Sequence, residues 1–232
     1  MFEKEKSGLE LLASKQLIRV PEVIGTFVGD DDQVLVLQWI EPGRKDDQFW
    51  KLFGQQLAAL HSSPCTYAGL NEYNYMGAMP QANNQSHDWI DFFIQQRLEP
   101  QVRLARDKKL LEPNHQKQFD QLYLALPGIF PKNQFALLHG DLWSGNFLCD
   151  DQGRPVLIDP AVYQGYPGMD LAMTTLFGGF NPEFYESYNH ILPFPSNYQE
   201  QWEICNLYPL LIHLNLFGKG YLQNITSIIQ YY

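Results

Sequence analysis

The chain has 232 residues, 45% of them hydrophobic, which is enough to bury the core of one large domain or of two small lobes. Its formal net charge of −10 at pH 7 argues against a nucleic-acid-binding protein, because such proteins need a basic surface to offset phosphate charge. The charged, amphipathic start and the short apolar tract at 207–218 predict neither a signal peptide nor a membrane span.

A small sheet with one helix is predicted before residue 41. Residues 3–15 have the pattern of a helix. The runs at 19–28 and 33–40 are rich in β-branched residues and are flanked by turn formers, as strands are. The sequence "EPGR" at 41–44 ends this pattern.

Helices dominate the prediction for the rest of the chain. Residues 46–63 predict a helix that begins near Asp46, a good capping residue, and that repeats apolar residues at helical spacing. The stretch 66–85 is rich in Asn, Gly and Tyr, and we expect an ordered loop there, since long irregular stretches in compact domains tend to be functional. Further helices are predicted at 87–110, 113–126, 168–178 and 197–230.

The three cysteines are widely spaced and form no CxxC pair (Cys65, Cys149 and Cys205). This usage predicts reduced, buried thiols and a cytoplasmic location, because disulfide frameworks belong to oxidising compartments.

A β-hairpin is predicted within "LLHGDLWSGNFLCDDQGRPVLIDP", residues 137–160. Two short apolar runs, 147–149 and 155–158, are separated by turn formers. With the turn centred between residues 152 and 153, Asn146 lies opposite Asp159, and opposed residues have Cβ atoms about 4.5–5.5 Å apart. The open end of the hairpin would therefore hold an amide and a carboxylate side by side.

These oxygens suit a hard cation. Mg²⁺ in phosphoryl-transfer sites is commonly held by one or two protein oxygens, with water and phosphate completing its coordination. Asp141 precedes Asn146 by one tight loop, so its carboxylate would be free to orient a substrate hydroxyl.

The order of these residues resembles the catalytic loop and metal-binding Asp of the protein-kinase-like fold. Gly140 stands where protein kinases usually carry Arg, which points to the small-molecule branch that includes aminoglycoside phosphotransferases and choline kinases. The segments "HGDLWSGN", "DPAVYQGYPGMDLAM" and "GLNEYNYMGAMPQANNQSHDWIDFFIQQRL" resemble the fructosamine kinase (ketosamine-3-kinase) family over nearly the whole chain. Trp143 and the Pro80-Gln81-x-Asn83 segment distinguish this family within the superfamily.

The resemblance implies an α+β, protein-kinase-like fold with a truncated N-terminal β-lobe, residues 1–41, and a mostly helical C-terminal lobe, residues 42–232. It implies transfer of the γ-phosphoryl group of ATP, with Mg²⁺, to the 3-hydroxyl of a ketosamine. The acceptor would be a fructosamine or ribulosamine on a small amine or on a protein lysine. Such phosphorylation makes the adduct labile, which links the family to protein deglycation. No nucleic-acid or membrane partner is expected.

The resemblance also assigns roles to residues. Asp141 would orient the attacking hydroxyl, and Asn146 and Asp159 would hold Mg²⁺. Trp143 would face the sugar, although core packing is an alternative for it. For Asp141 and Asn146, the alternative is an ordinary Asx-turn in a loop.

The remaining roles concern the nucleotide and support of the loop. The backbone at Gln38, Trp39 and Ile40 would contact adenine. Glu5 matches the family's helix Glu, or is an ordinary solvated residue. His139 and Asp170 would brace the catalytic loop, and helix N-capping is the alternative for Asp170.

One part of the kinase pattern is not found. The sequence has neither a GxGxxG nor a GxxxxGK[ST] segment, and Glu5 has no counterpart of its usual Lys partner. We therefore expect either a fragment of a longer kinase or a protein that lacks the Gly-rich hairpin that covers the nucleotide phosphates in kinases. Two other classes stay open: another small-molecule kinase, acting on an amino alcohol or aminoglycoside, and a non-catalytic binding protein.

Overall fold

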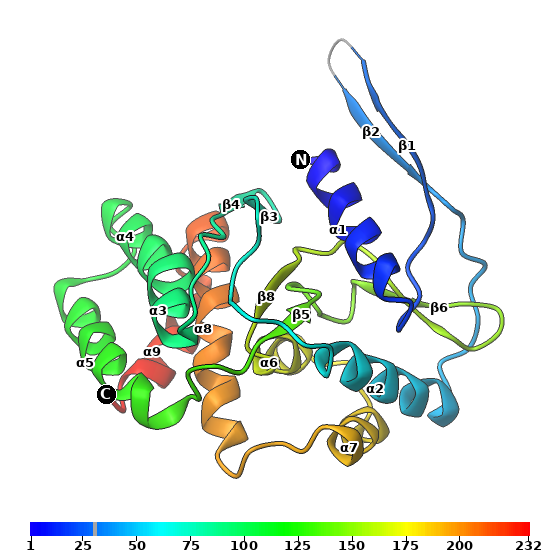
Figure 1. The fold of residues 1–232 in the computed structure, drawn as a ribbon. Coiled ribbons are helices and arrows are strands. Elements are labelled where there is room, and N and C mark those ends of the chain that lie inside the picture. The colour runs from blue at the N-terminus through cyan, green and yellow to red at the C-terminus, as the bar shows by residue number, and fades with distance from the viewer. Residues whose placement is uncertain (30–31) are drawn as a thin grey trace.

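The computed structural model describes residues 1–29 and 32–232. Its N-terminal part consists of helix α1, Phe2–Lys15, and an antiparallel hairpin of β1, Val23–Val28, and β2, Gln33–Leu37. The hairpin projects from the body of the molecule with α1 beside it (Figure 1). Gly8 of α1 lies against the side chains of Pro160 and Val162, where an added Cβ would be only 3.2 Å from Val162. This close approach places α1 over the chain that follows Asp159.

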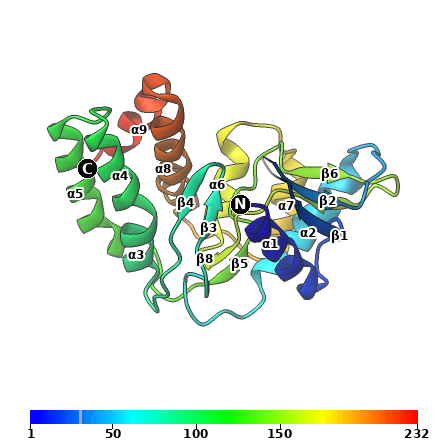
Figure 2. The ribbon, with the colours of Figure 1, turned by 90° about the horizontal axis from the view of Figure 1, so that it is seen from above.

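Short antiparallel strand pairs occupy the centre of the molecule. They are β3 with β4, β5 with β8 and β6 with β7, at Asn74–Met76, Met79–Gln81, Ala136–Leu138, Tyr163–Gly165, Phe147–Cys149 and Pro155–Leu157. Seen from above, the β3–β4 pair lies between α1 on one side and the helical group containing α8 on the other (Figure 2). The β3–β4 pair thus lies where the two sides of the molecule meet.

Helices form the remainder of the fold. They are α2, Asp47–His61; α3, Trp89–Phe92; the π-helical η1, Phe93–Leu98; α4, Glu99–Asp107; α5, Pro113–Ile129; α6, Gly168–Leu176; α7, Pro182–Ile191; α8, Tyr198–Phe217; the 3₁₀ turn η2, Lys219–Tyr221; and α9, Leu222–Ile229. Helix α8 packs against α4, α6 and α9, and α2 packs against α7. None of the helices in the described residues is long and apolar enough to cross a membrane.

Helix α2 shows why the sequence folds in this way locally. The Asp46 carboxylate accepts a hydrogen bond of 2.9 Å from the Phe49 N–H and so satisfies one of the free donors at the helix start. The Phe53 ring, fully buried, lies 5.0 Å from Phe147 of β6 and 5.2 Å from Phe184 of α7. One aromatic face therefore joins α2 to the strand that leads out of the catalytic loop.

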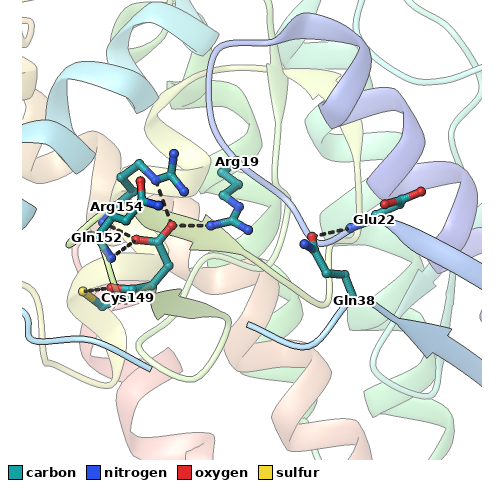
Figure 3. Close-up of polar contacts among 7 residues, drawn as sticks. Arg19, Glu22, Gln38, Cys149, Gln152 and Arg154 are labelled. Carbon is teal, nitrogen blue, oxygen red and sulfur yellow. Dashed lines mark hydrogen bonds and ion pairs between the residues drawn. The ribbon is translucent and has the colours of Figure 1, made fainter. Parts of the chain in front are cut away.

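The β6–β7 hairpin is anchored through its turn. Asp150, almost fully buried, accepts hydrogen bonds from the Gln152 N–H (3.0 Å), the Arg154 N–H (2.8 Å) and the Arg154 Nε–H (2.8 Å). The Arg19 guanidinium, at the entrance to β1, contacts the same carboxylate (Figure 3). Because burial of a carboxylate is costly without partners, these contacts fix the turn against the N-terminal part of the chain.

Several sequence predictions are confirmed and others are wrong. The predicted helices at 3–15, 46–63, 113–126 and 168–178 are present within a few residues. The expected loop at 66–85 instead contains the β3–β4 pair, and the expected helix at 197–230 breaks at Gly218, whose φ of 87° ends α8. The helix predicted at 87–110 includes the π-helical η1. Helix α7 and strands β5 and β8 were not predicted. Of the cysteines, all free, Cys149 and Cys205 are buried, whereas Cys65 is half-buried.

Candidate active site

His139 fixes the loop that carries Asp141. Its imidazole is fully buried, with Nε2 2.9 Å from the Ile158 carbonyl and Nδ1 3.3 Å from the Asp141 N–H. A carbonyl only accepts and an N–H only donates, so Nε2 carries the proton and Nδ1 accepts. Burial lowers the pKa of His139, which keeps this neutral tautomer at physiological pH. The predicted role of His139 in supporting a catalytic loop stays a prediction.

Asp170 braces the same loop from α6. Its carboxylate accepts hydrogen bonds from the N–H groups of His139 (2.7 Å) and Gly140 (2.8 Å), and His61 Nε2 lies 3.2 Å away. Burial acts to raise the pKa of Asp170, but its hydrogen bonds to His61 and to the Gly140 N–H bring that pKa below its ordinary value. The ionised carboxylate therefore holds the backbone just before Asp141.

The alternative role of Asp170, as a helix cap, is not observed. Helix α6 begins after Pro167 without a side-chain cap, and Asp170 lies within its first turn. The loop approaches the backbone of Ala161 closely because residue 140 is a glycine. Its φ is +84°, and an added Cβ would lie 2.1 Å from the Ala161 carbonyl oxygen.

The predicted pairing of Asn146 with Asp159 is wrong by one residue. Phe147 pairs with Leu157, so the Asn146 carbonyl accepts a hydrogen bond of 3.1 Å from the N–H of Ile158. The cause is Gly153, whose left-handed φ of 73° adds one residue to the turn. The turn therefore contains an odd number of residues, whereas a turn centred between residues 152 and 153 would contain an even number.

Asn146 contacts Asp141 instead. The Asn146 Nδ2 donates to the Asp141 carbonyl at 2.9 Å and to its Oδ2 at 3.1 Å. This contact uses the amide N–H groups and fixes the rotamer of the Asp141 carboxylate. The Asn146 oxygen is left free of that contact.

Asp159 lies two residues beyond the end of β7, where the chain turns toward the site. Its φ of 55° is left-handed, a conformation that Asp adopts more readily than most residues. Its side chain lines a cavity of about 180 Å³ together with Glu5 and Asp141, while Lys4 and Asn74 contribute to the wall. The carboxylate of Glu5, from the start of the chain, thus lines the same small cavity as those of Asp141 and Asp159.

This arrangement perturbs two of the carboxylates. Burial raises the pKa of Asp141 to about 7, and the charge of Asp159 adds to the shift while the Asn146 hydrogen bond opposes it. Burial likewise raises the pKa of Glu5 to about 7, followed by the charge of Asp159 and a hydrogen bond with it. Groups with such shifts in a cleft mark candidate functional sites.

A second cavity, of about 240 Å³, adjoins the first at Asp141 and Gly77. Its walls include Trp143, Phe177 and His213, and most of its lining is apolar. The Trp143 side chain is partly exposed and meets Phe177 edge to face, with ring centroids 6.0 Å apart. Trp143 is therefore a cavity wall and not a core residue.

Two histidines in this region were not singled out by the sequence. His61 is fully enclosed, with Nδ1 2.8 Å from the Tyr188 hydroxyl and Nε2 on Asp170. His213 lies on α8 with Nδ1 2.7 Å from the Pro209 carbonyl, so its Nδ1–H donates there. Neither has the paired spacing that reveals a metal site, and each is far in sequence from the residue group it joins.

The segment predicted to contact adenine lies apart from these cavities. Gln38 and Trp39 are exposed, Ile40 is buried, and all three lie in the connection between β2 and α2. The Gln38 N–H donates to the Glu22 carbonyl at 2.8 Å, and Trp39 Nε1 donates to Glu41 at 3.1 Å. Their contact with a nucleotide stays a prediction.

A larger cavity, of about 660 Å³, lies between α6, α7 and α8 and contains none of the predicted site residues. Size alone does not make it the active site, because the perturbed carboxylates and the constrained loop lie elsewhere. We place the candidate site at the junction of the two smaller cavities.

Comparisons with known proteins show the family of this chain. The family model described as "Fructosamine kinase" matches residues 1–232. The chain belongs to the fructosamine kinase family.

Relatives of this family member are found in bacteria and plants. A candidate ketoamine kinase of Synechocystis sp. is 41% identical over 231 residues, which cover 99% of this chain and 78% of the relative. The chloroplastic protein-ribulosamine 3-kinase of Arabidopsis thaliana is 35% identical, with 100% of this chain and 72% of the relative covered.

Solved structures confirm the predicted protein-kinase-like fold of this fructosamine kinase family member. The crystal structure of a candidate fructosamine-3-kinase from Haemophilus somnus superposes with a TM-score of 0.90 at 28% identity, covering 100% of this chain and 79% of that one. The aminoglycoside phosphotransferase APH(4)-Ia, in a ternary complex with ADP and hygromycin B, gives a TM-score of 0.66 at 13% identity, covers 99% of this chain and 82% of that one, and supports the fold alone.

Proposed function

We propose that this protein transfers the γ-phosphoryl group of ATP to the 3-hydroxyl of a ketosamine, a fructosamine or ribulosamine. The observation that carries the proposal is the position of Asp141, which lines both adjoining cavities. One cavity holds the acidic groups that a metal–nucleotide complex needs, and the other has the aromatic wall that suits a sugar. A hydroxyl bound in the second cavity would meet the phosphate at Asp141.

Asp141 fits the role of the group that orients the attacking hydroxyl. Its carboxylate accepts a hydrogen bond from the Asn146 amide, and its backbone N–H donates to His139 in the braced loop. With a pKa raised to about 7, it can accept a proton from the hydroxyl as the phosphoryl group transfers. Orientation matters most, because phosphoryl transfer asks little covalent work of the protein.

The residues present also fit Mg²⁺. Among residues 1–29 and 32–232, no three His, Cys, Asp or Glu side chains converge to hold a metal unaided. Mg²⁺ needs no such cage, since phosphate and water oxygens complete its octahedron. Asp159 and the amide oxygen of Asn146 would hold the ion, which would neutralise charge on the β- and γ-phosphates.

The acceptor cavity favours a sugar. The flat face of Trp143 offers a rigid apolar surface for the C–H face of a carbohydrate, while Asp141 reads a hydroxyl beside it. The amine that bears the sugar, a small amine or a protein lysine, would extend toward solvent.

The test is a direct comparison of acceptors with the purified protein, Mg²⁺ and ATP. Fructoselysine, ribuloselysine, choline and kanamycin are each supplied, ADP release is measured, and ³¹P NMR locates the phosphate. We expect phosphate on the 3-hydroxyl of a ketosamine. Phosphorylation of choline or kanamycin without any ketosamine product would reject the proposal.

A further inference from the structure

The β3–β4 hairpin forms part of both cavities. Asn74 and Tyr75 line the cavity that contains Asp159, Met76 lines the one that contains Trp143, and Gly77 lines both. A small displacement of this hairpin would therefore change the shape of the acceptor site next to Asp141.

A buried hydrogen-bond network lies beneath the hairpin. The Asn74 Oδ1 accepts from Gln81 Nε2 and from Asn83 Nδ2, each at 2.8 Å. The Asn74 Nδ2 donates to the Val162 carbonyl at 2.8 Å, and Gln81 Nε2 donates to the Ala161 carbonyl at 3.1 Å. The network thus ties the hairpin to the chain immediately after Asp159.

Arg97 supports this network from η1. Its guanidinium is fully buried, donates to Asn83 Oδ1 at 2.7 Å and to the Ala82 carbonyl at 2.5 Å, and lies 4.0 Å from the Tyr163 ring centroid. Within the described part of the chain it forms no ion pair, so neutral acceptors and aromatic faces alone stabilise the charge. A cation buried in this way tolerates little change in the position of its partners.

Gln81 is fixed at both ends of its amide. Its Oε1 accepts a hydrogen bond of 2.9 Å from the Tyr208 hydroxyl on α8, while its Nε2 serves Asn74 and Ala161. The side chain has a fixed orientation because reversing it would set the oxygen against two acceptors. Gln81 therefore links the β3–β4 hairpin to α8 and to the chain that follows Asp159, and it fixes their relative positions.

We propose that Gln81, Asn83 and Arg97 are positioning residues that hold the β3–β4 hairpin beside Asp141 and thereby determine acceptor binding. This inference rests on the proposed function for the identity of the acceptor. The positioning itself is independent of turnover. Neither Gln81 nor Asn83 lines the cavity that contains Asp159 or the one that contains Trp143. The inference therefore gives the Pro80-Gln81-x-Asn83 segment a role that does not require contact with a substrate.

The principal variant is Gln81→Glu, which replaces a buried donor by an oxygen facing Asn74 Oδ1 and the Ala161 carbonyl. Gln85→Glu is the matched control, because Gln85 is an exposed amide of the same segment that donates to Asn71. Asn83→Asp is a milder second variant, since Arg97 can compensate the new charge. It loses the donor to Asn74 and keeps the acceptor for Arg97.

Two measurements decide the inference, and neither requires catalysis. Amide hydrogen exchange should accelerate about tenfold or more at 74–81 and 161–165 in Gln81→Glu, while α2 and α7 are unchanged. Calorimetric titration with fructoselysine should show a Kd raised about tenfold, with the Kd for Mg–ATP within about twofold of wild type. Asn83→Asp should change the exchange rates and the Kd for fructoselysine in the same direction but by less. Gln85→Glu should leave both quantities unchanged.

Other outcomes overturn the inference. Uniformly faster exchange in both variants would mean that the network only adds global stability. Equal changes in the Kd values for fructoselysine and for Mg–ATP would show that the network does not act on acceptor binding in particular. An unchanged Kd for fructoselysine, with faster exchange confined to the hairpin, would show the same. If wild type binds no fructoselysine, the proposed function fails on its own, and the exchange pattern still decides whether the network positions the hairpin.

Discussion

The carboxylates of Asp141 and Asp159 repel one another across a cavity of about 180 Å³, and this repulsion adds to burial in holding the pKa of Asp141 at about 7. Two acidic groups with different environments in one site is a common arrangement in acid–base catalysis. Here the Asp141 carboxylate is fixed by the Asn146 amide, and Asp159 is a left-handed residue that follows strand β7.

Asp141→Asn should lower kcat on a ketosamine by roughly 10²–10⁴-fold, the usual range for a positioned acid–base group. The Kd for ATP should change far less than kcat, because the side chain keeps its shape and its contact with the Asn146 amide. Steady-state kinetics and calorimetric titration measure the two quantities. Unaltered turnover would show that the role of Asp141 is assigned wrongly.

The same variant should change the pH dependence of stability. The folded-state pKa of Asp141 is raised above its unfolded value, so its contribution to stability is present at low pH and is lost as pH rises through about 7. Without metal, Asp141→Asn should therefore melt higher than wild type at pH 8, and the difference should shrink toward pH 5. Scanning fluorimetry in EDTA measures this, and a difference independent of pH would contradict it.

Asp170 should show the opposite dependence. Its folded-state pKa is depressed, so the stability that it provides is present above its unfolded pKa and is lost as pH falls through the folded one. Asp170→Ala should cost about 3 kcal/mol or more at pH 7, because buried N–H groups of His139 and Gly140 lose their acceptor.

Denaturant unfolding at pH 7 and at pH 3 measures the effect of Asp170→Ala. The gap between wild type and variant should narrow at the lower pH. Asp151→Ala, at an exposed carboxylate in the β6–β7 turn, is the control and should change stability little.

Trp143→Ala should raise KM for a fructosamine more than KM for ATP, because the ring borders the acceptor cavity and not the one that contains Asp159. Steady-state kinetics with each substrate varied in turn provides the comparison. Equal effects on both constants would indicate a purely structural Trp.

The 232-residue chain should bind ATP weakly and have low kinase activity. Within residues 1–29 and 32–232, Glu5 forms no ion pair, and its carboxylate faces Asp159 in the cavity proposed for the metal–nucleotide complex. Glu5→Gln should tighten binding of Mg–ATP, since it removes one negative charge from the site.

Calorimetric titration of wild type and Glu5→Gln tests this expectation. Glu10→Gln, at an exposed carboxylate of the same helix, is the control and should behave as wild type. Rapid ketosamine phosphorylation by the wild-type 232-residue chain would refute the prediction and would show that another group supplies the missing positive charge.

Local patterns predicted the fold where one segment determines its own structure. The apolar spacing and Asp46 cap of α2 are examples, and so are the turn formers of the β6–β7 hairpin. The register of that hairpin failed because the left-handed conformation of Gly153 adds one residue to the turn. Strands β5 and β8 were missed because they are short and pair across a long stretch of sequence.

In the site too, residues that a local sequence pattern marks were predicted, and residues brought in by tertiary contacts were not. Asp141, Asn146, Trp143 and Asp159 stand close together in the sequence in a recognisable order. His61, the last residue of α2, joins the site only through its contact with Asp170 of α6, and no local pattern marks a histidine that will bond to a distant carboxylate. Contacts of this kind depend on the tertiary fold and are visible only once it is known.

Gly145 affects the shape of a cavity that it does not line. An added Cβ there would lie 2.4 Å from the Trp143 ring, so the indole rests on the bare backbone of residue 145. Any larger residue would displace the indole and change the shape of the cavity that Trp143 lines. The absence of a side chain at residue 145 thus helps to set the width of a cavity whose wall another residue forms.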